Sequence, residues 1–246
     1  MEKFKLALIE ELASKGNKNA IIEMAQYYYD YKNAKDLDTE KSELINSCLL
    51  KLAESNDKEA MILLGGLYYE GVGFQQSYKE AVKWYEKAAA ELDERGLCYL
   101  GYCYYHGRDI EKNYEKAYSY FSLSAYMGNV NAMYKLGDMF FYGQYVKEDK
   151  DAAFFWYHEG LGNDEGLYVN SGIEYRLGKC YLHGYGVEEN LILALEMLQS
   201  AEKGFLELAE GGDPFSGITL KSVKKEIDIA RERLYAWHET PPQYRI

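Results

Sequence analysis

Long apolar segments are absent from this sequence of 246 residues. No run approaches the 18 or so apolar residues that would suggest a membrane span. The N-terminal stretch MEKFKLALIEELASKG has a four-residue apolar run before Glu10 and Glu11, which is too short and too acidic for a secretory signal. It is predicted to form an amphipathic helix, and no membrane partner is expected.

Cysteine and clustered basic residues are also scarce. The four cysteines show no tight pairing pattern, so a disulfide framework is not expected and a reducing cytoplasm is predicted. Acidic residues outnumber basic ones by 40 to 28, and the most basic run, residues 221–225, is followed by Glu226 and Asp228. Because phosphate neutralisation needs clustered Lys and Arg, nucleic acid is not expected as a partner.

The chain is rich in tyrosine, with 26 tyrosines against three prolines, and it contains an internal repeat. Four octets share Leu, Gly, an aromatic fifth residue and a closing Gly: LGGLYYEG (64–71), LGYCYYHG (100–107), LGDMFFYG (136–143) and LGKCYLHG (177–184). Their spacings are 36, 36 and 41 residues, and the last predicts a longer loop within 162–172. A weaker fifth copy precedes them, with Ala20, Met24 and Ala25 in its first helix.

Each unit is predicted to be a helix, turn, helix hairpin. Ala60, Leu64 and Tyr68 recur at i, i+4 and i+8, which is one stripe of an α-helix, and alternation of period two is absent. The glycines that follow, Gly71 and Gly73, can end that helix in a left-handed conformation. A hairpin of this size cannot bury both of its apolar stripes alone, so neighbouring hairpins are expected to stack.

These residues resemble the Sel-one-like repeat family, a branch of the tetratricopeptide-like α-solenoids. The family pattern, roughly A-x-x-x-L-G-x-x-Y-x-x-G-x-G followed by K-A-x-x-W-Y-x-K-A-A, matches residues 60–73 and 81–89, and the resemblance covers about 19–204. Asp109 and Tyr145 depart from the pattern by replacing the second turn glycine, which leaves the geometry of those two turns open.

The resemblance implies an all-α fold, a right-handed superhelical solenoid of about five antiparallel helix pairs in a single domain over residues 1–246. The repeats would span about 19–55, 60–92, 96–128, 132–164 and 173–204. Residues 205–217 are predicted to form a short helix and loop, with a cap over about 205–240. The capping helix would place Ile218, Val223, Ile227, Ala230, Leu234 and Trp237 on its inner face.

The resemblance further implies a non-catalytic adaptor or scaffold that binds a protein or peptide, without choosing the partner. In solenoids of this kind the first helix of each pair lines a concave groove, and nearby acidic residues would favour a partner with Lys or Arg. The predicted partner-binding residues are Tyr29, Asp30, Tyr69, Glu70, Tyr102, Tyr105, His106, Tyr134, Asp138, Phe141, Tyr142, Tyr175, Lys179 and His183.

Cys103 and His106 are metal-ligating residue types, and they have counterparts in Cys180 and His183. Helices two repeats apart would lie about 20 Å apart if repeats stack about 10 Å apart, whereas zinc needs all ligands at about 2.0 to 2.3 Å. No metal site and no cofactor is therefore expected, and the two pairs are interpreted as ordinary residues at equivalent repeat positions.

Two other functions stay open as alternatives. One is a hydrolase of the β-lactam-recognising kind, an activity that the resemblance implies because it is sometimes attributed to related repeat proteins. Ser-x-x-Lys occurs at Ser55, Ser200 and Ser222, but without an accompanying Ser-Asp-Asn or Lys-Thr-Gly these matches are interpreted as background. The four histidines show no recognisable nucleophile pattern, so no catalytic residue is predicted. The other alternative is a self-assembling structural element.

Overall fold

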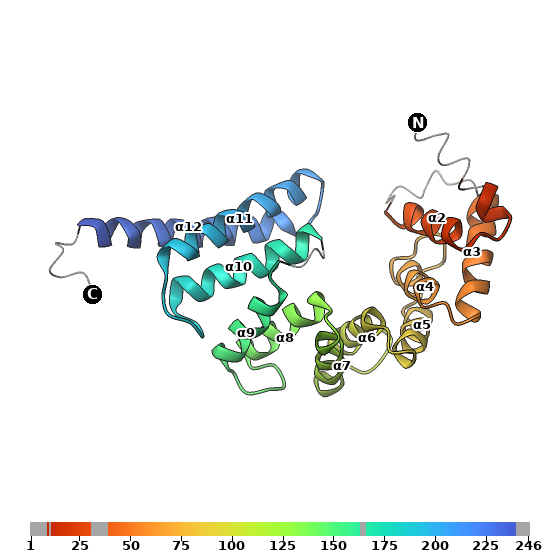
Figure 1. Cartoon of the computed structure of the whole chain (residues 1–246), viewed down its shortest axis with the longest axis horizontal. Coiled ribbons are helices and arrows are strands. Elements are labelled where there is room, and N and C mark those ends of the chain that lie inside the picture. Colours follow the sequence, from red (N-terminus) through yellow and green to blue (C-terminus); the bar gives the residue numbers. More distant parts are fainter. Residues whose placement is uncertain (1–8, 10, 31–38, 163–165, 240–246) are drawn as a thin grey trace. The chain divides into compact units, whose positions relative to one another are not determined.

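The computed structural model describes residues 9, 11–30, 39–162 and 166–239, apart from the side chains of 28–30 and 39–42. The elements within these ranges are α-helices, which confirms the predicted all-α class (Figure 1). They are α2 (Lys18–Asp30), α3 (Thr39–Glu54), α4 (Lys58–Glu70), α5 (Tyr78–Ala90), α6 (Glu94–His106), α7 (Tyr114–Tyr126), α8 (Val130–Tyr142), α9 (Lys150–Gly160), α10 (Leu167–His183), α11 (Leu191–Glu210) and α12 (Ser216–Glu239).

Two compact units divide the chain, Met1–Ser124 and Ala125–Ile246, and are called unit 1 and unit 2. Consecutive helices pack as hairpins within each unit, α2 with α3 and α4 with α5 in unit 1, then α8 with α9 and α10 with α11 in unit 2. This confirms a solenoid of helix pairs, including the weaker first copy. The prediction of a single domain over residues 1–246 stays a prediction.

Both ends of the repeat helices follow the local sequence. A short polar side chain accepts a backbone N–H at the N-terminus of α4 (Asp57), α5 (Ser77) and α8 (Asn129). The closing glycine of each octet ends the first helix in the left-handed conformation, with φ between 64° and 74°. The octet is therefore a helix followed by its stop signal.

The second turn residue also adopts positive φ in each of the four copies that carry an octet. The angles are 67° at Gly73, 56° at Asp109, 69° at Tyr145 and 71° at Gly186. The two turns that lack glycine thus keep the repeat geometry at the expense of some backbone strain, about 1 kcal/mol or more for a residue other than glycine.

The first glycine of each octet explains how closely the two helices of a hairpin approach. A Cβ at Gly65, Gly101, Gly137 or Gly178 would overlap the side chain 20 residues later in the second helix. Those side chains are Tyr85, Phe121, Tyr157 and Leu198, all nearly or fully buried. The small residue and the large one together fill the hairpin interface.

The sequence predicted that the five extra residues before the last octet lengthen a loop, but most of them lie in a helix. Helix α10 has 17 residues, whereas α4, α6 and α8 have 13 each, so four of the additional residues extend α10 at its N-terminus. The predicted short helix after residue 204 is likewise wrong, because α11 continues without a break to Glu210.

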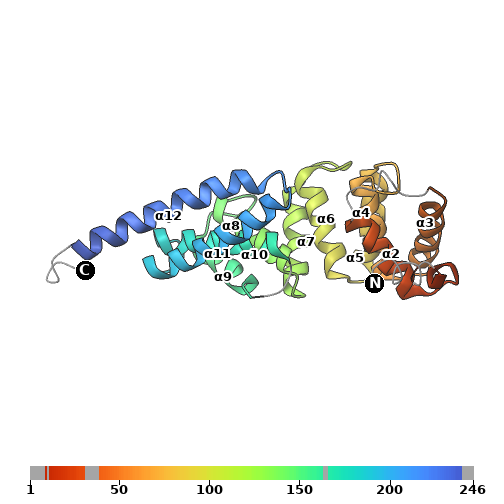
Figure 2. The ribbon, with the colours of Figure 1, turned by 90° about the horizontal axis from the view of Figure 1, so that it is seen from above.

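Helix α12 caps the last repeat, as predicted. It lies beside α10 and α11 in both views (Figures 1 and 2). Val223, Ile227 and Ala230 are buried there, in one core with Leu182, Ala194, Leu198, Ala201 and Phe205. The predicted inner face is too long at both ends, because Ile218 is 69% exposed and Trp237 is 43% exposed.

Candidate functional site

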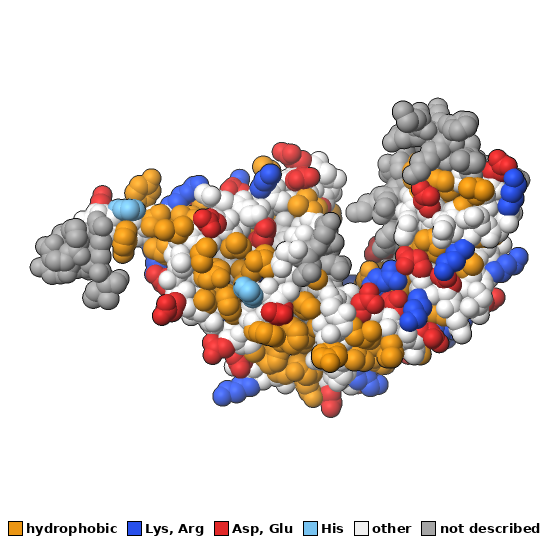
Figure 3. All heavy atoms as spheres, viewed as in Figure 1, with side chains coloured by type: hydrophobic (Ala, Val, Ile, Leu, Met, Phe, Trp, Pro, Cys, Tyr) orange, Lys and Arg blue, Asp and Glu red, His pale blue; other side chains and the backbone are white. Residues whose placement is uncertain are grey.

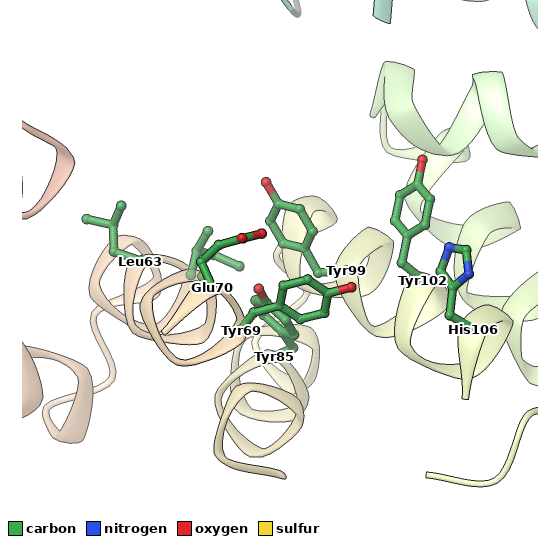
Figure 4. A pocket seen from close by; sticks show the side chains of 9 residues that line it. Leu63, Tyr69, Glu70, Tyr85, Tyr99, Tyr102 and His106 are labelled. Carbon is green, nitrogen blue, oxygen red and sulfur yellow. The ribbon is translucent and has the colours of Figure 1, made fainter. Parts of the chain in front are cut away.

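A hollow of about 270 Å³ opens in unit 1 between the first helices of two consecutive repeats, α4 and α6 (Figure 4). Four tyrosine rings, one carboxylate and one imidazole line it, and no Lys or Arg is among the lining residues. We call it the tyrosine pocket, and its residues are Ile62, Leu63, Gly66, Tyr69, Glu70, Tyr85, Tyr99, Tyr102 and His106.

Three helices contribute these side chains (Figure 4). Helix α5 supplies Tyr85, whose ring is held against Gly65 and whose centroid lies 5.0 Å from that of Tyr99 on α6. Also on α6, the rings of Tyr102 and His106 are parallel, with centroids 6.2 Å apart. The walls are therefore rings supported by other rings, which limits their rotamer freedom before any ligand binds.

Tyr69 forms part of both the pocket and a neighbouring cluster. Its ring meets Tyr78 edge to face at 5.0 Å, and the Arg108 guanidinium lies 5.1 Å from the Tyr78 centroid and 6.0 Å from the Tyr69 centroid. Burial raises the pKa of Tyr69, although Arg108 acts in the opposite direction. The phenol thus stays protonated at neutral pH and can donate a hydrogen bond.

Unit 2 has a smaller hollow at the equivalent place, between α8 and α10. It encloses about 70 Å³, and we call it the arginine pocket. Its residues are Phe141, Tyr142, Tyr157, Tyr175, Arg176 and Lys179. The Tyr157 ring has the position in α9 that Tyr85 has in α5, so the repeat builds the same floor twice.

A buried network accounts for the smaller volume. Arg176 donates through Nε to Asp138 Oδ1 at 2.5 Å and through a terminal nitrogen to Oδ2 at 3.1 Å, while the Tyr157 hydroxyl donates to Oδ1 at 2.9 Å. Asp138 is only 6% exposed. It had been predicted to face a cationic partner, and the structure corrects this: its charge is neutralised inside the protein by Arg176, which lies 38 residues further along the chain.

The predicted residues therefore divide into three groups. The tyrosine pocket brings together Tyr69, Glu70, Tyr102 and His106, and the arginine pocket brings together Phe141, Tyr142, Tyr175 and Lys179. The side chains of Tyr29 and Asp30 lie outside the described residues. The remaining four, which line neither pocket, are Tyr105, Tyr134, Asp138 and His183.

Like Asp138, the other three residues contact side chains elsewhere in the protein. Tyr105 packs against Tyr114 with ring centroids 5.2 Å apart, and Tyr134 lies under the guanidinium of Arg176 at 4.4 Å. His183 Nε2 lies 3.0 Å from a carboxylate oxygen of Glu226 on the capping helix. His183 thus contributes to the attachment of the cap.

Sequence reasoning missed Leu63, Tyr85 and Tyr99 in one pocket, and Tyr157 and Arg176 in the other. Leu63, Tyr99 and Arg176 each precede the leucine of an octet directly. The repeat alignment contained that signal, since this position varies among the copies while the leucine and glycine beside it do not.

Comparison with known proteins agrees with the repeat geometry. Four segments match the model of the Sel1 repeat, at residues 58–91, 95–129, 130–160 and 174–204. The chain belongs to the Sel1 repeat family. These segments coincide with the four octet-bearing hairpins, whereas the hairpin of α2 and α3 lies outside the match. No curated protein matches the chain.

Solved structures of Sel1 repeat proteins are similar to this one. A Sel1 repeat protein from Oxalobacter formigenes is 29% identical, with a TM-score of 0.60 over 77% of this chain and 74% of that one. A protective antigen with an SLR fold from uropathogenic Escherichia coli strains is 27% identical, with a TM-score of 0.64, and this chain spans half of its length. A putative Sel1 repeat protein from Klebsiella pneumoniae, 18% identical with a TM-score of 0.54, supports the fold alone.

The paired cysteines and histidines of the Sel1 repeats are separated by burial. Cys103 and Cys180 are at most 1% exposed, and burial raises the pKa of each thiol to about 12. His106 instead lines the tyrosine pocket, and His183 contacts the cap. In the described part of the chain no group of three or more His, Cys, Asp or Glu residues is placed to hold a metal ion.

At Ser55 and Ser200 the serine of the Ser-x-x-Lys match contacts a group other than its lysine. Ser55 donates to the Leu52 carbonyl at 2.7 Å, and Lys58 donates to the Glu91 carbonyl. Ser200 donates to the Glu174 carboxylate at 2.6 Å. These hydroxyls are therefore engaged in helix and interhelix contacts, and a neighbouring lysine does not activate them.

Surface charge is mixed on unit 1. Acidic and basic side chains are interspersed on the face seen in Figure 3, whereas hydrophobic side chains gather over α10 in unit 2. The formal charge of -12 is therefore not concentrated in one patch on that face of unit 1. None of the helices that the structure describes is long and apolar enough to cross a membrane.

Proposed function

We propose that this Sel1 repeat protein is a non-catalytic, cytoplasmic adaptor or scaffold that binds a protein or peptide through its two aromatic pockets. Sel1 repeats commonly mediate protein–protein interactions. The observation that carries the proposal is the recurrence of an aromatic hollow between the first helices of consecutive repeats, once in each unit. A hollow of this kind suits a partner that places one side chain in it.

The chemistry of the linings supports a protein ligand. Tyrosine presents a large ring at a small cost in conformational entropy and keeps a hydroxyl for hydrogen bonding, which is why it is frequent at binding hot spots. Glu70 is the one carboxylate of the tyrosine pocket, and it is exposed. Together with the net negative charge it favours a partner with Lys or Arg over an acidic one or a nucleic acid.

The proposal is tested by crosslinking and quantitative mass spectrometry in the native cell, with tagged full-length protein and three single variants. Tyr102→Ala removes a ring of the tyrosine pocket and Tyr142→Ala one of the arginine pocket. Tyr126→Ala is the matched control, because Tyr126 is 87% exposed and lines neither pocket. A true partner is enriched by the wild type and by Tyr126→Ala, and it is depleted about tenfold with a pocket variant.

Equal enrichment with all four proteins would contradict the proposal. Two further measurements on the same proteins in purified form address the alternative functions. Saturable turnover of nitrocefin that these variants alter would favour a hydrolase, and an apparent molar mass from light scattering that rises with protein concentration would favour self-assembly.

A further inference from the structure

We infer that the tyrosine pocket of unit 1 binds an arginine side chain of the partner, with the guanidinium stacked on tyrosine and paired with Glu70. This inference rests on the proposed function and names the group that the pocket recognises. It starts from a comparison of the two pockets, which occupy equivalent places in the repeat but differ in what fills them.

In unit 2 the protein supplies its own guanidinium. Arg176 lies 4.4 Å from the centroid of the Tyr134 ring and forms two hydrogen bonds with Asp138, beside the Tyr157 hydroxyl. Stacking on an aromatic face combined with a bidentate carboxylate contact is the arrangement that a planar guanidinium favours. The hollow that remains is about 70 Å³.

In unit 1 the same two positions hold different residues. Counted from the shared leucine, Gly66 stands where Asp138 stands, and Tyr99 stands where Arg176 stands. The internal ion pair is therefore replaced by open space and another ring, and the hollow is about 270 Å³. The floor of both pockets is a tyrosine ring, because Tyr85 stands at the repeat position of Tyr157.

The tyrosine pocket is suited to a cation from outside. Four tyrosine rings line it, its one carboxylate is Glu70, and its lining includes no basic side chain other than the imidazole of His106. Tyrosine faces of this unit already hold a guanidinium at the surface, where Arg108 lies over Tyr78 and Tyr69. Arg108 itself does not line the pocket. The guanidinium of a partner would therefore bind on the pocket side of Tyr69.

The inference is tested by NMR titration of the full-length protein with N-acetyl-arginine methylamide. The expected result is a saturable shift of the Gly66, Tyr69 and Tyr99 amide signals with an affinity in the millimolar range, as for a single anchoring side chain. The citrulline analogue, which is isosteric but neutral, should bind about tenfold more weakly. The lysine and trimethyl-lysine analogues should also bind more weakly, since neither is planar.

Three variants sharpen the test. Gly66→Asp combined with Tyr99→Arg installs the internal pair of unit 2 and should abolish binding, while circular dichroism reports whether the fold survives. Glu70→Gln keeps the shape and should weaken binding about tenfold, with less salt dependence. Arg108→Ala removes a neighbouring positive charge and should strengthen binding.

Several outcomes would overturn the inference: citrulline binding as well as arginine, trimethyl-lysine binding better, Glu70→Gln without effect, or Arg108→Ala weakening the interaction. The proposed function fails separately, when pocket variants leave the crosslinked partners unchanged. A partner lost with Tyr102→Ala, together with no arginine binding, would mean that the pocket holds another type of side chain.

Discussion

Gly65 of α4 lies against the ring of Tyr85 of α5, so closely that a Cβ on residue 65 would overlap three ring atoms. The same relationship joins Gly137 and Tyr157 in unit 2. Both tyrosines also form the floor of an aromatic pocket. The contact that sets the spacing of a hairpin therefore also sets the depth of its pocket, so the fold and the candidate site share one tyrosine.

Substitution of Gly137 by alanine should destabilise the protein, because the Tyr157 ring that the new Cβ would overlap cannot move away. The Tyr157 hydroxyl is held by Asp138 at 2.9 Å, and the side chain is fully buried. We expect a loss of about 2 to 3 kcal/mol in the free energy of unfolding, the range for overpacking of a fixed site. The measurement is urea denaturation followed by circular dichroism.

Gly217→Ala is the matched control for that experiment. Gly217 is also helical, in α12, but nothing lies within 4 Å of the position that its Cβ would take. Alanine should stabilise the protein there by up to about 1 kcal/mol through helix propensity. Equal effects of the two substitutions would show that the ring contact does not limit the approach of α8 and α9.

Removal of the Asp138 carboxylate should destabilise unit 2 strongly. Asp138→Ala leaves the Arg176 guanidinium and the Tyr157 hydroxyl without their acceptor. Breaking one side of a buried pair costs about 3 to 5 kcal/mol, whereas replacing both sides with apolar residues costs much less. In a double-mutant cycle of urea midpoints, Asp138→Ala with Arg176→Met should thus be more stable than Asp138→Ala alone, and additive losses would argue against a paired network.

The hairpins could be predicted from the sequence because their packing is local. Leu64, Gly65 and Ala81 belong to one hairpin, so a fixed spacing records a fixed contact. Asp138 could not be placed in the same way. Its partner Arg176 comes from the next repeat. The repeat spacing places a carboxylate on the predicted groove face in the same way whether that carboxylate contacts solvent or a guanidinium.

The lengths of helices near the end of the chain were harder to predict for a related reason. Leu167 and the residues after it lack the repeat pattern, yet they continue α10 by one turn. Neither a proline nor a capping residue marks the point after residue 204, where the predicted last repeat ends. Pocket residues such as Tyr99 escaped because they flank the packing stripe, where the repeat allows variation.

Turn glycines should differ in how strictly they are required. At Gly186, with φ of 71°, a Cβ would overlap the carbonyl group of Lys150, so Gly186→Ala meets both backbone strain and a steric clash. A loss of at least about 2 kcal/mol in the free energy of unfolding is expected. Asp109 has φ of 56° at the equivalent position and is exposed, so Asp109→Gly should change stability by less than about 1 kcal/mol. Thermal unfolding of both variants checks the difference.

Alkaline pH should destabilise the folded protein. Burial raises the pKa of Cys103 and Cys180 from 9.0 to about 12, so the folded state keeps two protons that the unfolded chain releases above about pH 9. The stability that the neutral thiols contribute is complete below pH 9 and falls progressively as pH rises toward 12. The urea midpoint should therefore decrease over this interval, and the decrease should become smaller in Cys103→Ala with Cys180→Ala after correction for the cavities.

The same burial predicts that a thiol reagent at pH 8 modifies the half-buried Cys48 well before Cys98, Cys103 and Cys180. Rapid modification of all four in the folded protein would contradict the assignment of these thiols to the packed core.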